Sequence, residues 1–105
     1  MIVSTTPTIE GHPIREYRGV VSGEAIIGAN VLKDIEARFR DVFGGRSDSY
    51  ERVIREARDT SLREMVDEAL RMGCNAIVGI DFDYETIGVN NSMLMVSCNG
   101  TAVII

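Results

Sequence analysis

The chemistry that this sequence could do is concentrated in the stretch GIDFDYE, residues 79–85. Asp81, Asp83 and Glu85 are spaced two residues apart, with Phe82 and Tyr84 between them. Residues two apart in a β-strand point to the same face of a sheet, so this spacing places three carboxylates in one row. Carboxylate oxygens are the ligands that hard cations such as Mg²⁺ and Ca²⁺ prefer. The row predicts either a weak site for such a metal ion or a wet or inter-subunit face, and we favour the face.

A second candidate is the stretch GGRSDS, residues 44–49, which precedes a predicted helix. Backbone N–H groups, the helix dipole and an arginine can together hold an anion. The candidate anion-binding residues are Gly44, Gly45, Arg46 and Ser47. The glycines can equally end one helix while Ser47 and Asp48 cap the next, and we favour this interpretation. The chain has neither GxxxxGK[ST] nor GxGxxG, so nucleotide binding has no support.

The remaining metal-binding and nucleophilic side chains are sparse. Cys74 and Cys98 are the only thiols, and His12, the only histidine, lies far away near the start of the chain. A zinc site needs further Cys or His ligands, and there is no CxxC. We therefore expect both cysteines to be buried as small hydrophobic residues. Paired carboxylates could act as acid and base, but no histidine accompanies a serine or cysteine, so no catalytic residue is predicted.

Composition limits the class of protein. The chain has 105 residues, of which 45% are hydrophobic and 26% charged, which suits a single domain over residues 1–105. The net charge of −5 argues against nucleic-acid binding, which needs a basic excess. No apolar run approaches the length of a membrane span, and we see no signal peptide. Two isolated cysteines suit a reducing cytosol, so we expect a cytoplasmic protein.

The pattern of apolar residues predicts an α+β fold, with a small antiparallel sheet and two helices on one face. Residues 1–13 hold both prolines and predict a short extended arm that ends in a turn. Asp48 and Glu51 have capping-box spacing at the start of the longer helix, and Gly73 ends it. The expected elements after the arm are a strand at 14–26, helices at 30–43 and 48–72, and strands at 76–88 and 92–105.

Alternation along the strands predicts two different faces. Gly19 and Gly23 leave room for a helix to approach closely. The residues expected under the long helix are Tyr17, Val21, Ala25, Ile80, Phe82, Tyr84, Leu94, Val96, Cys98 and Ala102. Those expected on the open face are Arg18, Asp81, Asp83, Glu85, Met93, Met95 and Asn99. Apolar side chains on a nominally wet face often mark a contact surface, so we expect Met93, Met95 and Arg18 at an interface between copies. The arm could pair with a neighbour's sheet edge.

Five segments together resemble the YbjQ-like family: STTPTIEG, GEAIIGAN, GGRSDSYE, AIVGIDFDYETIG and SMLMVS. The match runs in one colinear order over nearly the whole chain. Relatives often have Asn-Gly in the hairpin turn, where this chain has Asn90–Asn91. The resemblance implies a dodecin-like subunit that assembles into a ring-shaped homopentamer. The family is of unknown function and is labelled as heavy-metal-binding, but the label carries no ligand motif that maps onto this sequence.

The residues and the resemblance together predict a cytosolic homopentameric binding or assembly protein that does no catalysis. Its ligand stays open, and a metal ion and a small anion are both candidates. The first alternative is an enzyme whose site forms between subunits, from Asp81, Asp83 or Glu85 with Arg46 or Arg18. The second alternative is a ring that serves as a scaffold for a protein partner.

Overall fold

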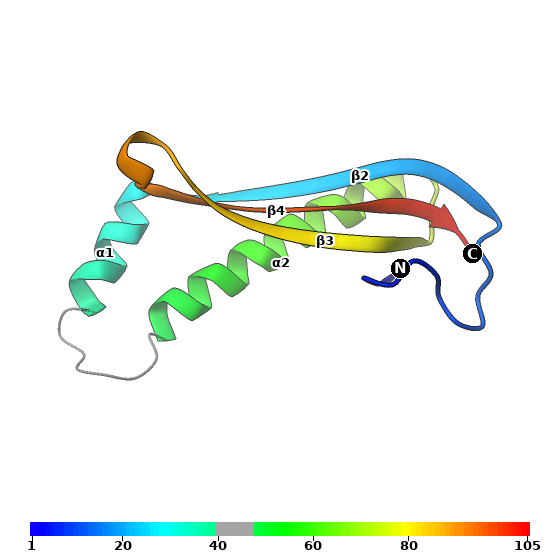
Figure 1. Cartoon of the computed structure of the whole chain (residues 1–105), viewed down its shortest axis with the longest axis horizontal. Helices are drawn as coiled ribbons and strands as arrows, with labels where there is room; N and C mark the ends of the chain where they lie inside the picture. Colours follow the sequence, from blue (N-terminus) through cyan, green and yellow to red (C-terminus); the bar gives the residue numbers. More distant parts are fainter. Residues whose placement is uncertain (40–47) are drawn as a thin grey trace.

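The structure, a computed structural model, describes residues 1–39 and 48–105 and has an α+β architecture (Figure 1). The predicted elements are confirmed to within about two residues at each described boundary. The candidate anion-binding residues Gly44, Gly45, Arg46 and Ser47 lie outside the described residues. The elements are β1 (Ile2–Val3), β2 (Glu16–Ile27), α1 (Ala29–Phe39), α2 (Asp48–Arg71), β3 (Ala76–Ile87), a 3₁₀ turn (Val89–Asn91) and β4 (Met93–Ile104).

The sheet has the strand order β1-β3-β4-β2, with β4 antiparallel to both of its neighbours. β1 is parallel to β3, with Ile2 opposite Ala76 and Val3 opposite Ile77, so the sheet is mixed rather than antiparallel throughout. The arm folds back along its own chain, where the backbone N–H of Gly79 donates to the carbonyl of Thr6 at 2.9 Å. In this structure the arm therefore extends the sheet of its own chain.

The hairpin between β3 and β4 closes through two asparagines. Asn90 and Asn91 have φ values of 57° and 54°, the left-handed conformation that asparagine tolerates better than most residues. The expected role of this pair in the turn is confirmed.

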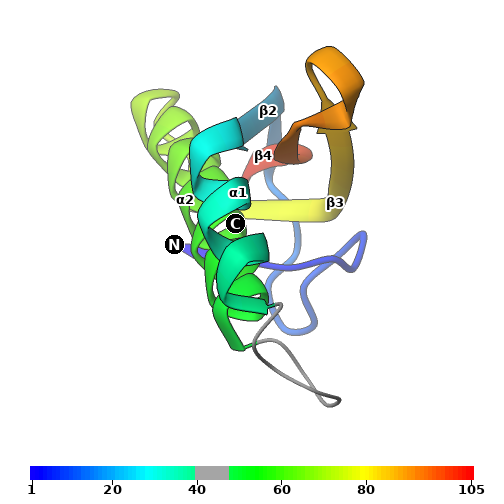
Figure 2. The same cartoon turned by 90° about the vertical axis from the view of Figure 1, so that its left-hand side faces the viewer.

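α2 lies along one face of the sheet and packs mainly on β2 and β4, as Figures 1 and 2 show. Its apolar stripe contributes Met65 and Ala69 to a buried cluster. The strand residues of this cluster are Val21, Ile77, Ile80, Cys98 and Ala102, and Cys74 joins it from the α2–β3 loop. α1 lies at the end of the sheet where β2 ends, and its Leu32 packs on a second cluster of Ile27, Ala57 and Val96.

The sheet has two bulges, and the one in β2 explains where the predicted faces were wrong. In β2, Tyr17 is opposite Val103 but Gly19 is opposite Ala102, so the extra residue Arg18 shifts the alternation. Tyr17 consequently lies on the face away from α2, not under the helix. A second bulge between Val78 and Asp81 contains Gly79, which has φ +63°. Both bulges contain a glycine with positive φ, a conformation that residues with a Cβ rarely adopt.

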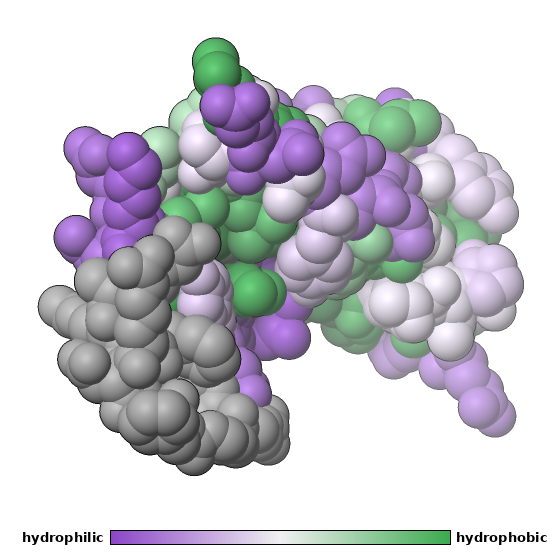
Figure 3. Space-filling model, turned by 60° about the vertical axis from the view of Figure 1, so that its left-hand side comes forward, coloured by the Kyte–Doolittle hydropathy of each residue, from purple (hydrophilic) through white to green (hydrophobic). Residues whose placement is uncertain are grey.

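The molecule is long and thin. Its extents are 53 × 28 × 17 Å and its radius of gyration is 16.8 Å, whereas a compact domain of this length has about 13 Å. Figure 3 shows hydrophobic residues exposed among hydrophilic ones on this face of the molecule. The chain leaves a large part of its sheet uncovered by its own helices.

Within the described ranges 1–39 and 48–105, no helix combines the length and apolar character needed to cross a membrane.

The close approach of α2 to β2 at Gly23 can be tested by adding one methyl group. A Cβ at this position would overlap the Ser61 carbonyl oxygen and lie 2.9 Å from the Met65 nitrogen, and both are backbone atoms that cannot rotate away. Gly23→Ala should lower the free energy of unfolding by about 2–3 kcal/mol in urea titrations. The matched control is Gly28→Ala, because its Cβ would meet nothing within 4 Å, and it should change stability by less than about 1 kcal/mol. Equal stabilities of the two variants would contradict this account.

Candidate functional site

The three predicted carboxylates share the open face of the sheet, opposite to α2. Asp81 is opposite Asn99, Asp83 is opposite Ser97, and Ser97 is also opposite Glu24 of β2. We call Glu24, Asp81, Asp83 and Glu85 the acidic face. All four are exposed, so the predicted placement of the row of three is confirmed and one further carboxylate joins it.

The carboxylates of the acidic face repel one another. The pKa of Asp83 is raised from its ordinary value of 3.8, chiefly by the charge of Asp81. Partial desolvation, a hydrogen bond with Asp81 and the charge of Glu85 act in the same direction. Asp81 and Asp83 therefore form a close pair whose negative charges are not compensated.

No cation of the three long strands compensates the acidic face. Within Glu16–Ile27, Ala76–Ile87 and Met93–Ile104 the only basic residue is Arg18. Its guanidinium is 2.9 Å from Glu16 (Nε to Oε1) and donates to the carbonyl of Met72 at 3.2 Å. Arg18 thus lies beside the C-terminal end of α2, where a cation is favourable. The expectation that it lies on the open face is wrong, because the bulge turns it towards the helix.

Apolar side chains border the acidic face. Val20 is 75% exposed and Ile26 is 58% exposed, and both point to the open side of β2. Met95 lies opposite Ile26 on the same face, and Met93 lies two residues before it. The placement of Met93 and Met95 on this face is confirmed, and both are half-buried. Val20 and Ile26 were missed by the sequence analysis, although their alternation with Ser22 and Glu24 was a readable signal.

The free edge of β2 is closed by two carboxylates from α2. The backbone N–H of Ser22 donates to Glu68 at 3.1 Å, and that of Glu24 donates to Glu64 at 3.2 Å. Glu64 and Glu68 are one helical turn apart, so they reach alternate residues of the strand. Exposed N–H groups on an edge strand invite pairing with another chain, and these two are occupied.

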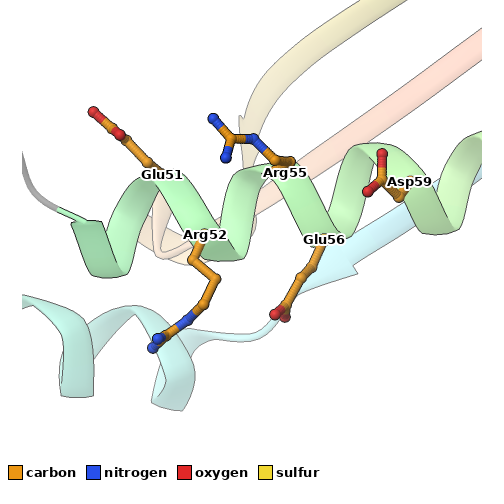
Figure 4. A pocket seen from close by; sticks show the side chains of 5 residues that line it. All are labelled: Glu51, Arg52, Arg55, Glu56 and Asp59. Carbon is orange, nitrogen blue, oxygen red and sulfur yellow. The ribbon is translucent and has the colours of Figure 1, made fainter.

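Arginines and an aromatic ring line a groove on the other side of the molecule. Between α2 and β3 the groove is bordered by Glu51, Ile54, Arg55, Arg58 and Tyr84. Arg55 also lines a neighbouring hollow along α2 with Glu51, Arg52, Glu56 and Asp59 (Figure 4). Arg58 forms an ion pair with Asp59 at 3.3 Å, whereas Arg52 and Arg55 form none with the described part of the chain. The sequence analysis missed this groove, because Tyr84 and the arginines are brought together only by tertiary structure.

Both cysteines are buried and free on the dry side of the sheet. Burial is the main cause that raises the pKa of each thiol. At Cys98 hydrogen bonds with Ser61 and Gly23 act against that rise, and at Cys74 the charge of Arg18 does so. The predicted burial is confirmed, and the raised pKa keeps both sulfurs in the neutral thiol form, which is a poor metal ligand.

The fold and these surfaces define a class of protein: an α+β domain with one dry, helix-covered sheet face and one open acidic face. The chain belongs to the YbjQ_1 family, whose model, described as "Putative heavy-metal-binding", matches residues 1–105. It is similar to the crystal structure, at 2.73 Å resolution, of a protein of unknown function of the DUF74 family from Pediococcus pentosaceus ATCC 25745. The identity is 17%, the TM-score is 0.61, and the match covers 100% of this chain and 97% of the other. This likeness shows the shared fold.

The described residues do not fit a soft heavy metal. Heavy metals of this kind prefer thiolate and thioether ligands, but Cys74 and Cys98 are neutral thiols inside the core, and the Met93 and Met95 thioethers lie on the opposite, open face. Across residues 1–39 and 48–105, no three His, Cys, Asp or Glu side chains converge into a group that could hold a metal ion. Asp81 and Asp83 are hard ligands on the opposite face from Cys98, so a mixed site within one chain is excluded by the sheet between them.

The raised pKa of Asp83 predicts how the stability of the folded state depends on pH. The folded state holds this proton more tightly than the unfolded chain, so stability should fall as the pH rises from below 3.8 through the higher pKa of the folded state. Asp83→Asn removes the repelled charge and should raise the thermal unfolding midpoint at pH 7 but not at pH 3. Asp67→Asn, on the exposed side of α2, serves as the control for loss of one carboxylate. A gain from Asp83→Asn that is equal at both pH values would contradict charge repulsion as the cause.

Proposed function

We propose that this protein is a cytosolic, ring-forming homo-oligomer whose subunits pack through the open face of the sheet and which acts as a binding or assembly protein rather than as an enzyme. The observation that carries the proposal is the uncovered face with Val20, Ile26, Met93 and Met95 beside four carboxylates. Five subunits is the number implied by the resemblance to the YbjQ-like family. Two free cysteines are compatible with the reducing cytosol.

The shape of the subunit supports self-association. A thin plate of 17 Å has little interior of its own, and a second copy on the open face would remove Val20 and Ile26 from water. Soluble monomers rarely expose contiguous apolar patches without a binding role. The enzyme alternative, whose site would form between subunits, has less support because Arg18 is already bound to Glu16 and to the Met72 carbonyl of its own chain.

Placing a charge on the open face should prevent assembly. Ile26→Lys puts an ammonium group where the proposal expects a dry contact, so it should shift the mass in light scattering from an oligomer to a single chain of 11.6 kDa. The matched control is Leu70→Lys, since Leu70 is 54% exposed, close to the 58% of Ile26, but lies on α2. A wild-type protein that is monomeric at all concentrations would contradict the proposed assembly. So would an Ile26→Lys variant of unchanged mass.

A second candidate function is binding of a hard divalent cation by Asp81, Asp83 and Glu85, whose exposed side chains would have to turn towards one ion because they do not converge in this structure. The observation in its favour is the pair of Asp81 and Asp83, close enough for the charge of Asp81 to raise the pKa of Asp83, which lies beside Glu85 and has no cation from the long strands. Oxygen ligands suit Mg²⁺ or Ca²⁺ rather than a soft metal. The family description refers to heavy metals, and the carboxylates of this chain would narrow that class to hard ions.

Native mass spectrometry before and after a chelator wash tests the cation. If the carboxylates hold it, the wild type should lose a fixed mass per subunit on chelation, and Asp81→Asn/Asp83→Asn should lack that mass from the start. The variant Cys74→Ala/Cys98→Ala should retain it, because both thiols are on the other side of the sheet. Loss of the mass in the cysteine variant alone would contradict the carboxylate site.

A further inference from the structure

Uncompensated charges of opposite sign lie on opposite sides of the sheet. On the open side the acidic face has four carboxylates, none of which forms an ion pair with the described residues. On the other side Arg55 likewise lacks a carboxylate partner in the described part of the chain. Asp83 and Arg55 cannot meet within one subunit because the sheet itself separates them.

We propose that the groove formed by Ile54, Arg55 and Tyr84 receives the acidic face of a second copy, with the Arg55 guanidinium bound to the Asp81–Asp83 pair. This inference rests on the proposed self-association and names the two surfaces that mate. A planar guanidinium presents paired donors that match two carboxylates in a row, and charge-assisted hydrogen bonds of this kind are the strong ones. An arginine of another copy would supply the cation that the acidic face lacks.

The apolar parts of the two surfaces also match. Tyr84 is half-exposed and forms the groove wall with Ile54, while Ile26 and Met95 lie beside the carboxylates of the acidic face. Contacts that combine an aromatic or aliphatic centre with arginine are typical of protein interfaces. The groove carries acids as well: Glu51 lines it, and Asp59 is bonded to Arg58. Arg55 is therefore the guanidinium of the groove with no carboxylate of the described chain within ion-pair distance.

This contact joins two different surfaces, which makes it heterologous. Each copy would offer its groove to one neighbour and its acidic face to the next, and such contacts close into rings when the rotation permits. The edge of β2 stays closed by Glu64 and Glu68 in this arrangement, so face-to-groove packing does not compete with strand pairing there.

A charge exchange tests the contact. Unlabelled and ¹⁵N-labelled protein are mixed with a chelator present, and subunit exchange is followed by native mass spectrometry. Arg55→Asp and Asp83→Arg should each speed up exchange about tenfold, because losing such a pair acts mainly on dissociation. The double variant Arg55→Asp/Asp83→Arg swaps the two charges, so that an acidic and a basic side chain again face each other across the contact. Its rate of subunit exchange should be within about threefold of the wild-type rate. Asp81→Arg provides a second variant of the acidic face, and all proteins are checked by circular dichroism.

The controls separate this inference from the proposed assembly. Arg63→Asp and Asp67→Arg make the same charge changes on exposed parts of α2 outside the groove and should leave exchange unchanged. If the single variants exchange like the wild type, or the double variant is no better than either single one, the Arg55 contact is overturned while the oligomer stands. If the chelator alone dissociates the wild type, a metal ion rather than Arg55 holds the acidic face. A monomeric wild type would overturn both proposals.

Discussion

The contact between Gly23 and the backbone of α2 at Ser61 is the constraint on which the arrangement of the layers depends. With no side chain at Gly23, the helix backbone comes directly against β2, and a Cβ there would overlap the carbonyl of Ser61. Ser61 is itself fully buried, and its hydroxyl donates to the Arg58 carbonyl at 2.8 Å, so this hydroxyl has a partner at the contact. This close approach lets small residues such as Ala69, Cys98 and Ala102 fill the layer between helix and sheet. It also directs Glu64 and Glu68 to the backbone of the edge strand.

Much of the fold could be predicted from the sequence, because each element has its own local signal. The period of α2, the alternation of β3 and β4 and the Asn90–Asn91 turn are all short-range features, and all three are confirmed. The misplacement of Tyr17 and Arg18 has one cause: a single extra residue at the β2 bulge moves every residue before it to the opposite face. A glycine in a strand can mark a bulge or a close approach of another backbone. In β2, Gly19 marks the bulge and Gly23 marks the close approach of α2.

The candidate site was predictable only in part, for a similar reason. Asp81, Asp83 and Glu85 share a face through strand geometry alone, so their spacing was sufficient. The groove between α2 and β3 depends on how far the helix diverges from the sheet. This angle is a property of the tertiary structure, and no local sequence pattern predicts it. The parallel pairing of β1 with β3 joins residues more than seventy positions apart, and a two-residue strand gives almost no periodic signal.

The buried thiols and the exposed carboxylates lie on opposite faces of the sheet, and this bears on the family's heavy-metal description. Thiol ligands and carboxylate ligands are both present in this chain, but Cys98 lies on the dry face, whereas Asp81 and Asp83 lie on the wet one together with the Met93 and Met95 thioethers. Successive residues of a strand point to opposite faces, so the sheet keeps the Cys98 thiol apart from these carboxylates however the side chains rotate. In a ring built from face-to-groove contacts, each acidic face would meet the outer surface of a neighbour's α2 rather than the buried thiols. The cation bound there would be the neighbour's arginine or a hard metal ion, and these two would compete for the same carboxylate oxygens. Binding of a divalent cation and tightness of the ring would then be opposed, which links ligand occupancy directly to assembly.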